Sequence, residues 1–286
     1  MNFRTDLALE AVEGVSLSAD DMHRVCQKEG TLTLTHLHIS SEKGGRAIGK
    51  PRGHYITAAF PSLTDDERQL TEHATAIGRE LATLLPPEGT VLVVGLGNRA
   101  VTPDALGPAA AGAVLATRHI QGEFARAADL TDLRPTAVLA PGVLGQTGIE
   151  SSEIVRGICR EIRPVAVIVI DALAARSARR LGCTVQLCDT GISPGSGVGN
   201  DRRPLNREVL GVPVIGMGMP TVVDAATLVA DRIGEDVTPS DPPMMVTPRE
   251  VDLLISRGAR LLGMSIHAAL QPDYSPLELT QIAQGM

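Results

Sequence analysis

The sequence has 286 residues, of which 43% are hydrophobic and 21% charged, with a formal net charge of −7 at pH 7. This composition is typical of a globular protein, and the length suits one large domain or two small ones. The acidic balance and the scarcity of aromatic residues argue against a nucleic-acid surface, which needs a basic stripe and, for single strands, aromatic platforms. We therefore expect no direct nucleic-acid partner.

Cysteine usage and the N-terminus indicate the compartment. The four cysteines form no Cys-x-x-Cys pair, so we expect reduced thiols and neither a disulfide framework nor a cysteine metal site. Asp6 and Glu10 interrupt the stretch where a secretion signal would be apolar, and no later apolar run has the length of a membrane span. The sequence predicts a soluble, cytoplasmic protein with no membrane partner.

Residues 1–63 are predicted to form a β-containing segment that packs on the rest of the chain. The stretch TLTLTHLHIS at 31–40 alternates apolar and polar residues, but its phase slips between Leu34 and Leu37, which predicts a strand with a β-bulge. A second β-like run follows at residues 54–59. His36 and His38 share one strand face, but nothing nearby supplies the other ligands that zinc needs, and we expect no metal.

Residues 64–286 are predicted to form an α/β catalytic core, and the two segments together are expected to form one structural domain. Runs such as VAVIVI are apolar on both faces, as buried parallel strands are. The predicted fold class is α/β, a three-layer sandwich with a mostly parallel sheet. Strands are expected at 91–95, 136–140, 165–170, 184–187 and 212–217, and helices at 65–85, 103–119, 151–163, 172–181, 221–233 and 248–270, the last after a proline-rich loop at 234–248.

The first candidate site residue is Asp104, in the segment VLVVGLGNRAVTPDALGP. A buried strand ends at Gly95, and Thr102-Pro103 predicts the start of a helix because threonine is a common N-cap and proline a common first helical residue. Asp104 then lies in the first helical turn, where the helix dipole stabilises a carboxylate. Alone, it is weak evidence, because an ordinary acid at a helix start is the favoured interpretation.

The second candidate is Asp171, which follows the apolar strand at 165–170. We expect it at the carboxyl end of this strand, where open α/β sheets place their ligand sites. Alone, it is equally a cap of the following helix.

Together, Asp104 and Asp171 predict a catalytic pair. Right-handed strand-helix-strand connections can bring the two strand ends to one crevice. Two neighbouring carboxyl groups do not both ionise readily, so one keeps a proton while the other is charged. The charged group can take a proton from an attacking water, and the protonated group can stabilise the oxyanion or protonate the leaving nitrogen. The pair predicts peptide hydrolysis without a cofactor.

Two glycine-rich segments offer alternatives. Gly95–Ala100 follows the loose pattern G-x-G-x-x-A of a nucleotide site, but the next strand has no terminal acid for a ribose and the helix begins late. A non-catalytic nucleotide-binding module is therefore a weaker hypothesis. The segment 189–206 lacks the Gly-Lys-Ser/Thr ending of a P-loop, and it is either a surface loop or a functional loop near the sheet edge.

Several segments together resemble the successive motifs of the germination protease family of spore-forming bacteria. They are VVGLGNRAVTPDALGP, the Thr-Arg-His of 117–119, PGVLGQTGIESSEIV, VIVIDALAARS, DTGISPGSGVGN and GVPVIGMGMPTVVDA. The opening FRTDLALEA and the later VTPREVD also match. The resemblance covers nearly the whole chain.

The resemblance implies an endopeptidase with an atypical aspartic-type mechanism, and a fold like that of hydrogenase-maturation proteases. Its substrates would be the small acid-soluble DNA-binding proteins of the spore, which it would digest during germination. The enzyme would be a homotetramer and would act in the forespore or spore core. The family's two catalytic aspartates correspond to Asp104 and Asp171. Further motif residues are expected to bind substrate or shape the site: Gly97, Asn98, Gly145, Glu150, Ser196 and Gly197. A metal-dependent peptidase of hydrogenase-maturation type stays an alternative, because those fold relatives place carboxylates near nickel.

The resemblance also implies a zymogen that removes a short propeptide by self-cleavage near Arg4–Ala8. The expected cut is the bond between Asp6 and Leu7. This chain has little sequence before that bond, which indicates an unusually short propeptide or a shortened start. The family usually carries a longer insertion at 234–246, so we expect regulation or assembly to differ here.

Overall fold

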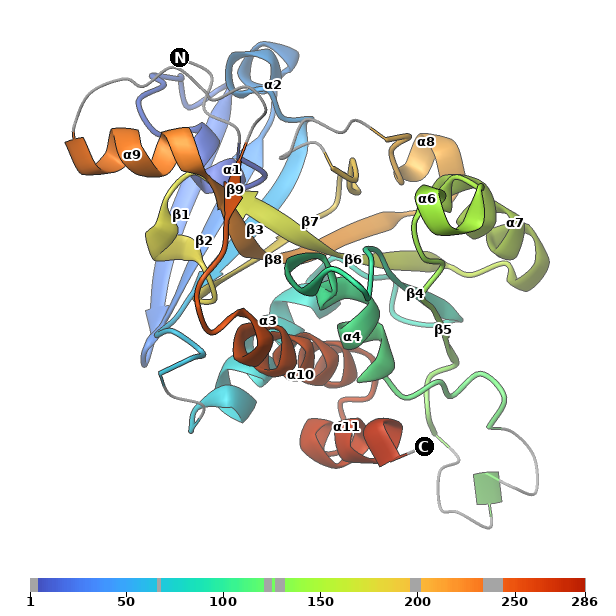
Figure 1. Cartoon of the computed structure of the whole chain (residues 1–286). Coiled ribbons are helices and arrows are strands. Elements are labelled where there is room, and N and C mark those ends of the chain that lie inside the picture. Colours follow the sequence, from blue (N-terminus) through green and yellow to red (C-terminus); the bar gives the residue numbers. More distant parts are fainter. Residues whose placement is uncertain are drawn as a thin grey trace.

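The computed structural model describes residues 5–65, 68–120, 125–126, 132–195, 202–233 and 244–285. Over these ranges the chain forms one nine-stranded sheet in the order β1-β2-β3-β7-β8-β6-β4-β5, with β9 beside β8. Helices cover both faces of this sheet (Figure 1). The predicted α/β class and three-layer architecture are confirmed.

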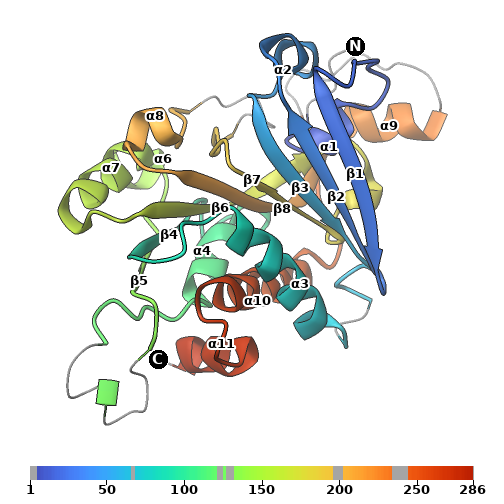
Figure 2. The same cartoon turned by 180° about the vertical axis from the view of Figure 1, so that it is seen from behind.

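The sheet has a parallel half and an antiparallel half. In the parallel half, β4 pairs with β5 and β6, and β6 pairs with β8. In the antiparallel half, β1, β2, β3 and β7 each run opposite to their neighbours, and Figure 2 shows β1, β2 and β3 extending the sheet away from β6 and β4. The strands are β1 (Met22–Glu29), β2 (Leu32–Ile39), β3 (Gly53–Ala59), β4 (Val91–Gly95), β5 (Thr136–Leu139), β6 (Ala166–Ala175), β7 (Thr184–Cys188), β8 (Val214–Asp224) and β9 (Met245–Val246).

One face of the sheet is covered by α3, α4 and α10, which enclose the largest apolar core. The spacing of buried residues explains this packing: Leu70, Ala74, Ile77 and Leu81 recur every three or four positions and form one apolar face of α3. On the other face, α7 and α8 cover the parallel half, and α1 lies over the antiparallel half with α2 at its margin. The helices are α1 (Ala8–Ala11), α2 (Glu42–Ile48), α3 (Leu70–Thr83), α4 (Leu106–Gly112), α6 (Leu144–Thr147), α7 (Ser151–Ile162), α8 (Arg207–Leu210), α9 (Ala225–Ile233), α10 (Val251–Leu270) and α11 (Pro276–Gly285), with short 3₁₀ helices η1 (Thr102–Asp104) and η2 (Ala178–Arg180).

The helix predicted at 172–181 is wrong. The strand β6 continues to Ala175, and only η2 follows it. The neighbouring β8 extends beside β6, with a register shift between Leu173 and Ala174. The alanine-rich segment has high helix propensity, but pairing with β8 overrides this weak local preference. Asp171 therefore lies inside a strand and not at its end.

The helix predicted at 103–119 is also shorter than expected. It consists of η1 and then α4, which ends at Gly112. Asp104 is the last residue of η1, directly before α4.

The β-bulge predicted in β2 is wrong too, because β2 pairs in continuous register with β1 and β3. The slip in its apolar pattern has another cause. Leu32 and Leu34 belong to the core under α3, whereas Leu37 and Ile39 belong to the core under α1. The strand is buried on opposite faces at its two ends.

The N-terminal strands join the same sheet as the α/β core, because β3 pairs with β7. The division of the chain at residue 63 stays a prediction. Of the two histidines on β2, His36 lies 3.7 Å from a carboxylate oxygen of Glu80, and His38 stacks on His54 with ring centroids 4.2 Å apart.

Candidate active site

A tight loop after β4 positions Asp104. The Leu96 N–H donates to the carbonyl oxygen of Ile170 at 2.8 Å, which fixes the loop to β6. The Asn98 N–H donates to Asp104 Oδ2 at 2.7 Å. Gly97 has φ +120°, and a Cβ there would lie 2.0 Å from the carbonyl oxygen of Asp104. Only glycine allows this approach, so the loop orients the Asp104 carboxylate through its own backbone.

A second glycine brings α4 against the two central strands. A Cβ at Gly107 would lie 2.1 Å from the Leu96 carbonyl oxygen and 2.6 Å from that of Ile170. Any larger residue would push α4 and the preceding η1 outward. The glycine thus keeps Asp104 close to β6.

Asp171 lies in β6 with its side chain almost fully buried, at 7% exposure. Its Oδ1 accepts a hydrogen bond of 2.9 Å from the Ala172 N–H. The register places Asp171 opposite Gly218 of β8. The carboxyl group is held by a rigid strand paired on one side with β8.

Asp104 and Asp171 line one cavity of about 510 Å³. The loop after β4, the start of α7 and the end of β6 form its walls. The predicted site residues that also line it are Gly97, Asn98, Gly145 and Glu150. Ser196 and Gly197 lie outside the described residues, although Pro194 and Gly195 beside them line the cavity. The roles of all these residues stay predictions.

The surroundings of the two carboxyl groups shift their pKa values to different extents. Burial raises the pKa of Asp104, and the hydrogen bond from the Asn98 N–H opposes this rise. Burial raises the pKa of Asp171 well above its ordinary value, and the nearby charges of Asp104 and Asp6 raise it further. Because charging one carboxyl disfavours charging the other, these surroundings favour ionisation of Asp104 before Asp171.

The loop at Gly95–Ala100 is poorly suited to a nucleotide. The backbone N–H of Asn98, which would have to bind a phosphate, donates to the Asp104 carboxylate instead. A carboxylate in that place repels a phosphate group. This geometry weakens the nucleotide-binding hypothesis.

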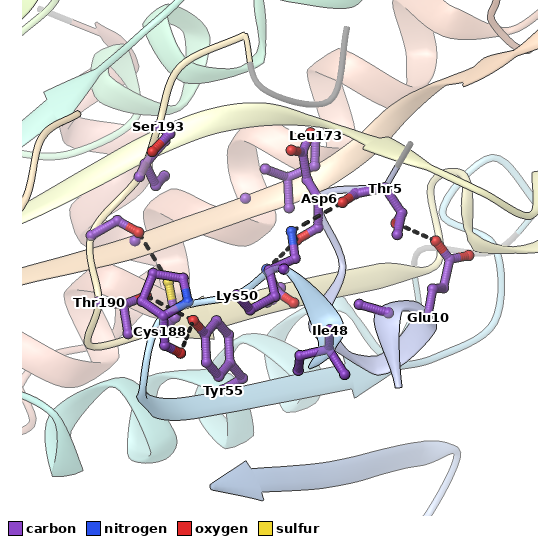
Figure 3. Close-up of a pocket in the computed structure, with 18 of the residues that line it drawn as sticks. Thr5, Asp6, Glu10, Ile48, Lys50, Tyr55, Leu173, Cys188, Thr190 and Ser193 are labelled. Carbon is purple, nitrogen blue, oxygen red and sulfur yellow. Dashed lines mark hydrogen bonds between the residues drawn. The ribbon is translucent and has the colours of Figure 1, made fainter. Parts of the chain in front are cut away.

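A second cavity, of about 740 Å³, was not predicted from the sequence (Figure 3). It shares Asp6 and Asp171 with the first cavity and is also lined by Lys50, Tyr55 and Gln186. Lys50 follows α2 in a turn with no recognisable motif. Gln186, in contrast, is a polar residue within the buried run Thr184–Cys188, a signal that could have been found in the sequence.

The predicted self-cleavage residues Asp6 and Leu7 lie beside the end of β6. The Asp6 N–H donates to the Ala174 carbonyl oxygen at 2.9 Å, and the Ala174 N–H donates to Asp6 Oδ2 at 2.8 Å. Leu7 is fully buried with Leu173 and Ala175. Burial of a leucine stabilises a fold by roughly 1.5–3 kcal/mol, so Leu7 anchors this segment.

Two observations concern the predictions about metal binding and membrane association. The part of the chain that the structure describes contains no group of three or more His, Cys, Asp or Glu side chains placed to bind a metal ion. None of the described helices combines the length and apolar character needed to cross a membrane.

Comparison with known proteins gives one consistent family. The family model described as germination protease matches residues 6–237. The germination protease of Caldanaerobacter subterraneus subsp. tengcongensis is 39% identical, with 99% of this chain and 98% of the relative aligned. That of Clostridium perfringens is 38% identical over 95% of this chain and 96% of the relative. That of Bacillus velezensis is 40% identical over 80% of this chain and 66% of the relative.

Among solved structures, a [NiFe] hydrogenase maturation protease, HycI from Thermococcus kodakarensis, is similar to 65% of this chain and 98% of its own, with a TM-score of 0.38 and 17% identity. The family match and the relatives extend over both Asp104 and Asp171. The chain belongs to the germination protease family.

Proposed function

We propose that this member of the germination protease family is an endopeptidase that hydrolyses peptide bonds with water activated between Asp104 and Asp171. One observation carries the proposal: the two carboxyl groups line a single cavity, and their surroundings favour a charged Asp104 and a protonated Asp171. Such a pair supplies a base and an acid at the same pH.

The steps follow from these protonation states. A water oxygen attacks the carbonyl carbon of the peptide bond while the Asp104 carboxylate takes one of the water's protons. As the carbon–nitrogen bond breaks, Asp171 donates its proton to the leaving nitrogen. The products are a carboxylic acid and an amine. Transfer of a proton from Asp104 to Asp171 restores the starting state.

The proposed substrates are the small acid-soluble DNA-binding proteins of the spore, whose degradation the enzyme would begin during germination. Family membership supports this proposal, and so does the net charge of −7, because basic DNA-binding proteins are attracted to an acidic partner. On the same family basis, we propose that the enzyme acts as a homotetramer in the forespore or spore core.

Self-cleavage between Asp6 and Leu7 is part of the proposal. The support is positional, because Asp6 borders both cavities together with Asp171. This position at the border of both cavities supports a cut at the bond between Asp6 and Leu7.

The proposal is tested by incubating the enzyme with a small acid-soluble spore protein and measuring the products by mass. Asp104→Asn and Asp171→Asn should each slow product formation about 10³-fold or more, whereas Asp252→Asn, on the exposed side of α10, should not. Near wild-type cleavage by either site variant, in a folded protein, would refute the catalytic pair.

The same assay separates the metal-dependent alternative. We expect cleavage to persist after exhaustive chelation and to be unchanged by added nickel or zinc. Loss of cleavage on chelation, with recovery when one metal is returned, would favour the metal-dependent peptidase instead.

A further inference from the structure

The carboxyl end of β6 has one open edge, and the N-terminal segment, defined as residues 5–10, covers it. The strand β4 pairs with β6 only as far as the pair of Gly95 and Ile170. Farther along, Ala174 exchanges hydrogen bonds with Asp6 instead of with a strand. The segment therefore occupies a place where an extended peptide can add to the sheet.

The far end of the segment is held by a buried carboxylate. Glu10 is 3% exposed and accepts hydrogen bonds from the N–H groups of Arg176 and Ser177 at 2.7 and 3.0 Å. Together with buried Leu7, this contact fixes the register of the segment along β6. Thr5, Asp6 and Glu10 of the segment line the cavity of about 740 Å³.

Within that cavity, one carbonyl oxygen of the segment receives two side-chain donors. The Lys50 ammonium lies 3.1 Å from the Asp6 carbonyl oxygen and 3.0 Å from that of Thr5, and Figure 3 shows its side chain reaching both residues. Gln186 Nε2 donates to the same Asp6 oxygen at 3.0 Å. Its Oε1 accepts from the Ala8 N–H at 2.7 Å.

The donors come from different parts of the fold, Lys50 from the turn after α2 and Gln186 from the centre of β7. Burial lowers the pKa of Lys50, while the charges of Asp6 and Glu10 oppose this change. Placing an ammonium group there is unfavourable by itself. Two peptide carbonyl oxygens accept from it and offset this cost, so the site holds a cation directed at the backbone of the segment.

Peptide hydrolysis is accelerated by hydrogen-bond donors at the carbonyl oxygen of the bond that is cut. When water attacks, the carbonyl oxygen becomes negatively charged, and donors already aimed at it lower the barrier. The Asp6 carbonyl belongs to the bond proposed for self-cleavage, and Asp171 lines the same cavity. Both donors are therefore directed at a peptide carbonyl in a cavity that the proposed acid also lines.

We infer that Lys50 and Gln186 form an oxyanion site, in which the carbonyl oxygen of the bond to be cut binds where the Asp6 carbonyl oxygen now lies. A protein substrate displaces the N-terminal segment from the open edge of β6 and presents its carbonyl to the same two donors. This inference rests on the proposed function.

The test is steady-state cleavage of a small acid-soluble spore protein by Lys50→Met and Gln186→Glu. Lys50→Met removes the ammonium with little change in length, and Gln186→Glu removes the amide donor while keeping the acceptor for Ala8. Each should lower kcat on the order of 10²-fold with little change in KM, because the donors act on the transition state. Lys50→Arg should recover most of kcat. The matched control is Lys43→Met, which loses only the ion pair with Asp21.

The inference would be overturned if Lys50→Met or Gln186→Glu folded correctly and had the wild-type kcat. A raised KM with an unchanged kcat would also overturn it, because it would indicate a residue that only holds the segment. Either folded variant is sufficient if the other does not fold. Asp171→Asn separates this inference from the proposed function. If Asp171→Asn is inactive and Lys50→Met is fully active, the oxyanion site is wrong and the catalytic pair stands. If Asp171→Asn is active and Lys50→Met is not, the catalytic pair is wrong and the oxyanion site stands.

Discussion

The parallel and antiparallel halves of the sheet contribute different groups to the two cavities that meet at Asp171. The parallel half supplies the carboxyl groups, with Asp104 from the loop after β4 and Asp171 from β6. The antiparallel half and its margin supply hydrogen-bond donors, with Gln186 on β7 and Lys50 after α2. Under the proposed mechanism and the inferred oxyanion site, proton transfer and carbonyl binding belong to two different regions, and each region can be altered separately.

The largest expected effect tests whether the two carboxyl groups act as one unit. Asp104→Asn and Asp171→Asn should each lower kcat about 10³-fold or more, and the double variant should be little worse than either single variant. Single-turnover cleavage of the spore protein measures all three rates. Losses that multiply in the double variant would mean that the two groups act independently.

A smaller effect is expected from the loop that orients Asp104. Gly97→Ala forces a side chain into a position with φ +120° and against the Asp104 backbone. We expect about 1–3 kcal/mol of strain, relieved by displacement of the loop, and a kcat lowered about 10-fold or more. Kinetics together with denaturant unfolding measure both quantities. Gly157→Ala, on the exposed side of α7 and outside both cavities, is the control, because its Cβ would enter open space.

The smallest effect concerns the N-terminal segment. Glu10→Gln places an amide where a buried carboxylate accepts from the N–H groups of Arg176 and Ser177. The free energy of unfolding should fall by about 1–3 kcal/mol, while cleavage of a protein substrate should be as fast as in the wild type or faster, because the substrate displaces a less firmly held segment. Urea unfolding and the cleavage assay measure the two. A large loss of cleavage would show that the segment takes part in catalysis.

Much of the fold could be predicted from local patterns. The continuous apolar run of β4 and the apolar spacing in α3 and α10 each specify an element by themselves. The extension of β6 past Asp171 could not be predicted, because it depends on pairing with β8 and with the N-terminal segment. The alanine-rich sequence there has the local properties of a helix.

The candidate site divides in the same way. Asp104 and Asp171 follow recognisable strands in motifs of the family, so the sequence indicates both. Lys50 lies between two glycine- and proline-containing turns with no motif, and its partners are 44 and 45 residues away along the chain. Only the folded sheet brings β7, the turn after α2 and the N-terminal segment together.

The pH dependence of kcat/KM tests the central claim most directly, because the claim requires a charged Asp104 and a protonated Asp171 at the same pH. We predict a bell-shaped profile, with an acid limb above the ordinary aspartate value of 3.8 from Asp104 and a more alkaline limb from Asp171. The residual activity of Asp171→Asn should keep the acid limb and lose the alkaline one. An alkaline limb that persists unchanged in Asp171→Asn would contradict the account.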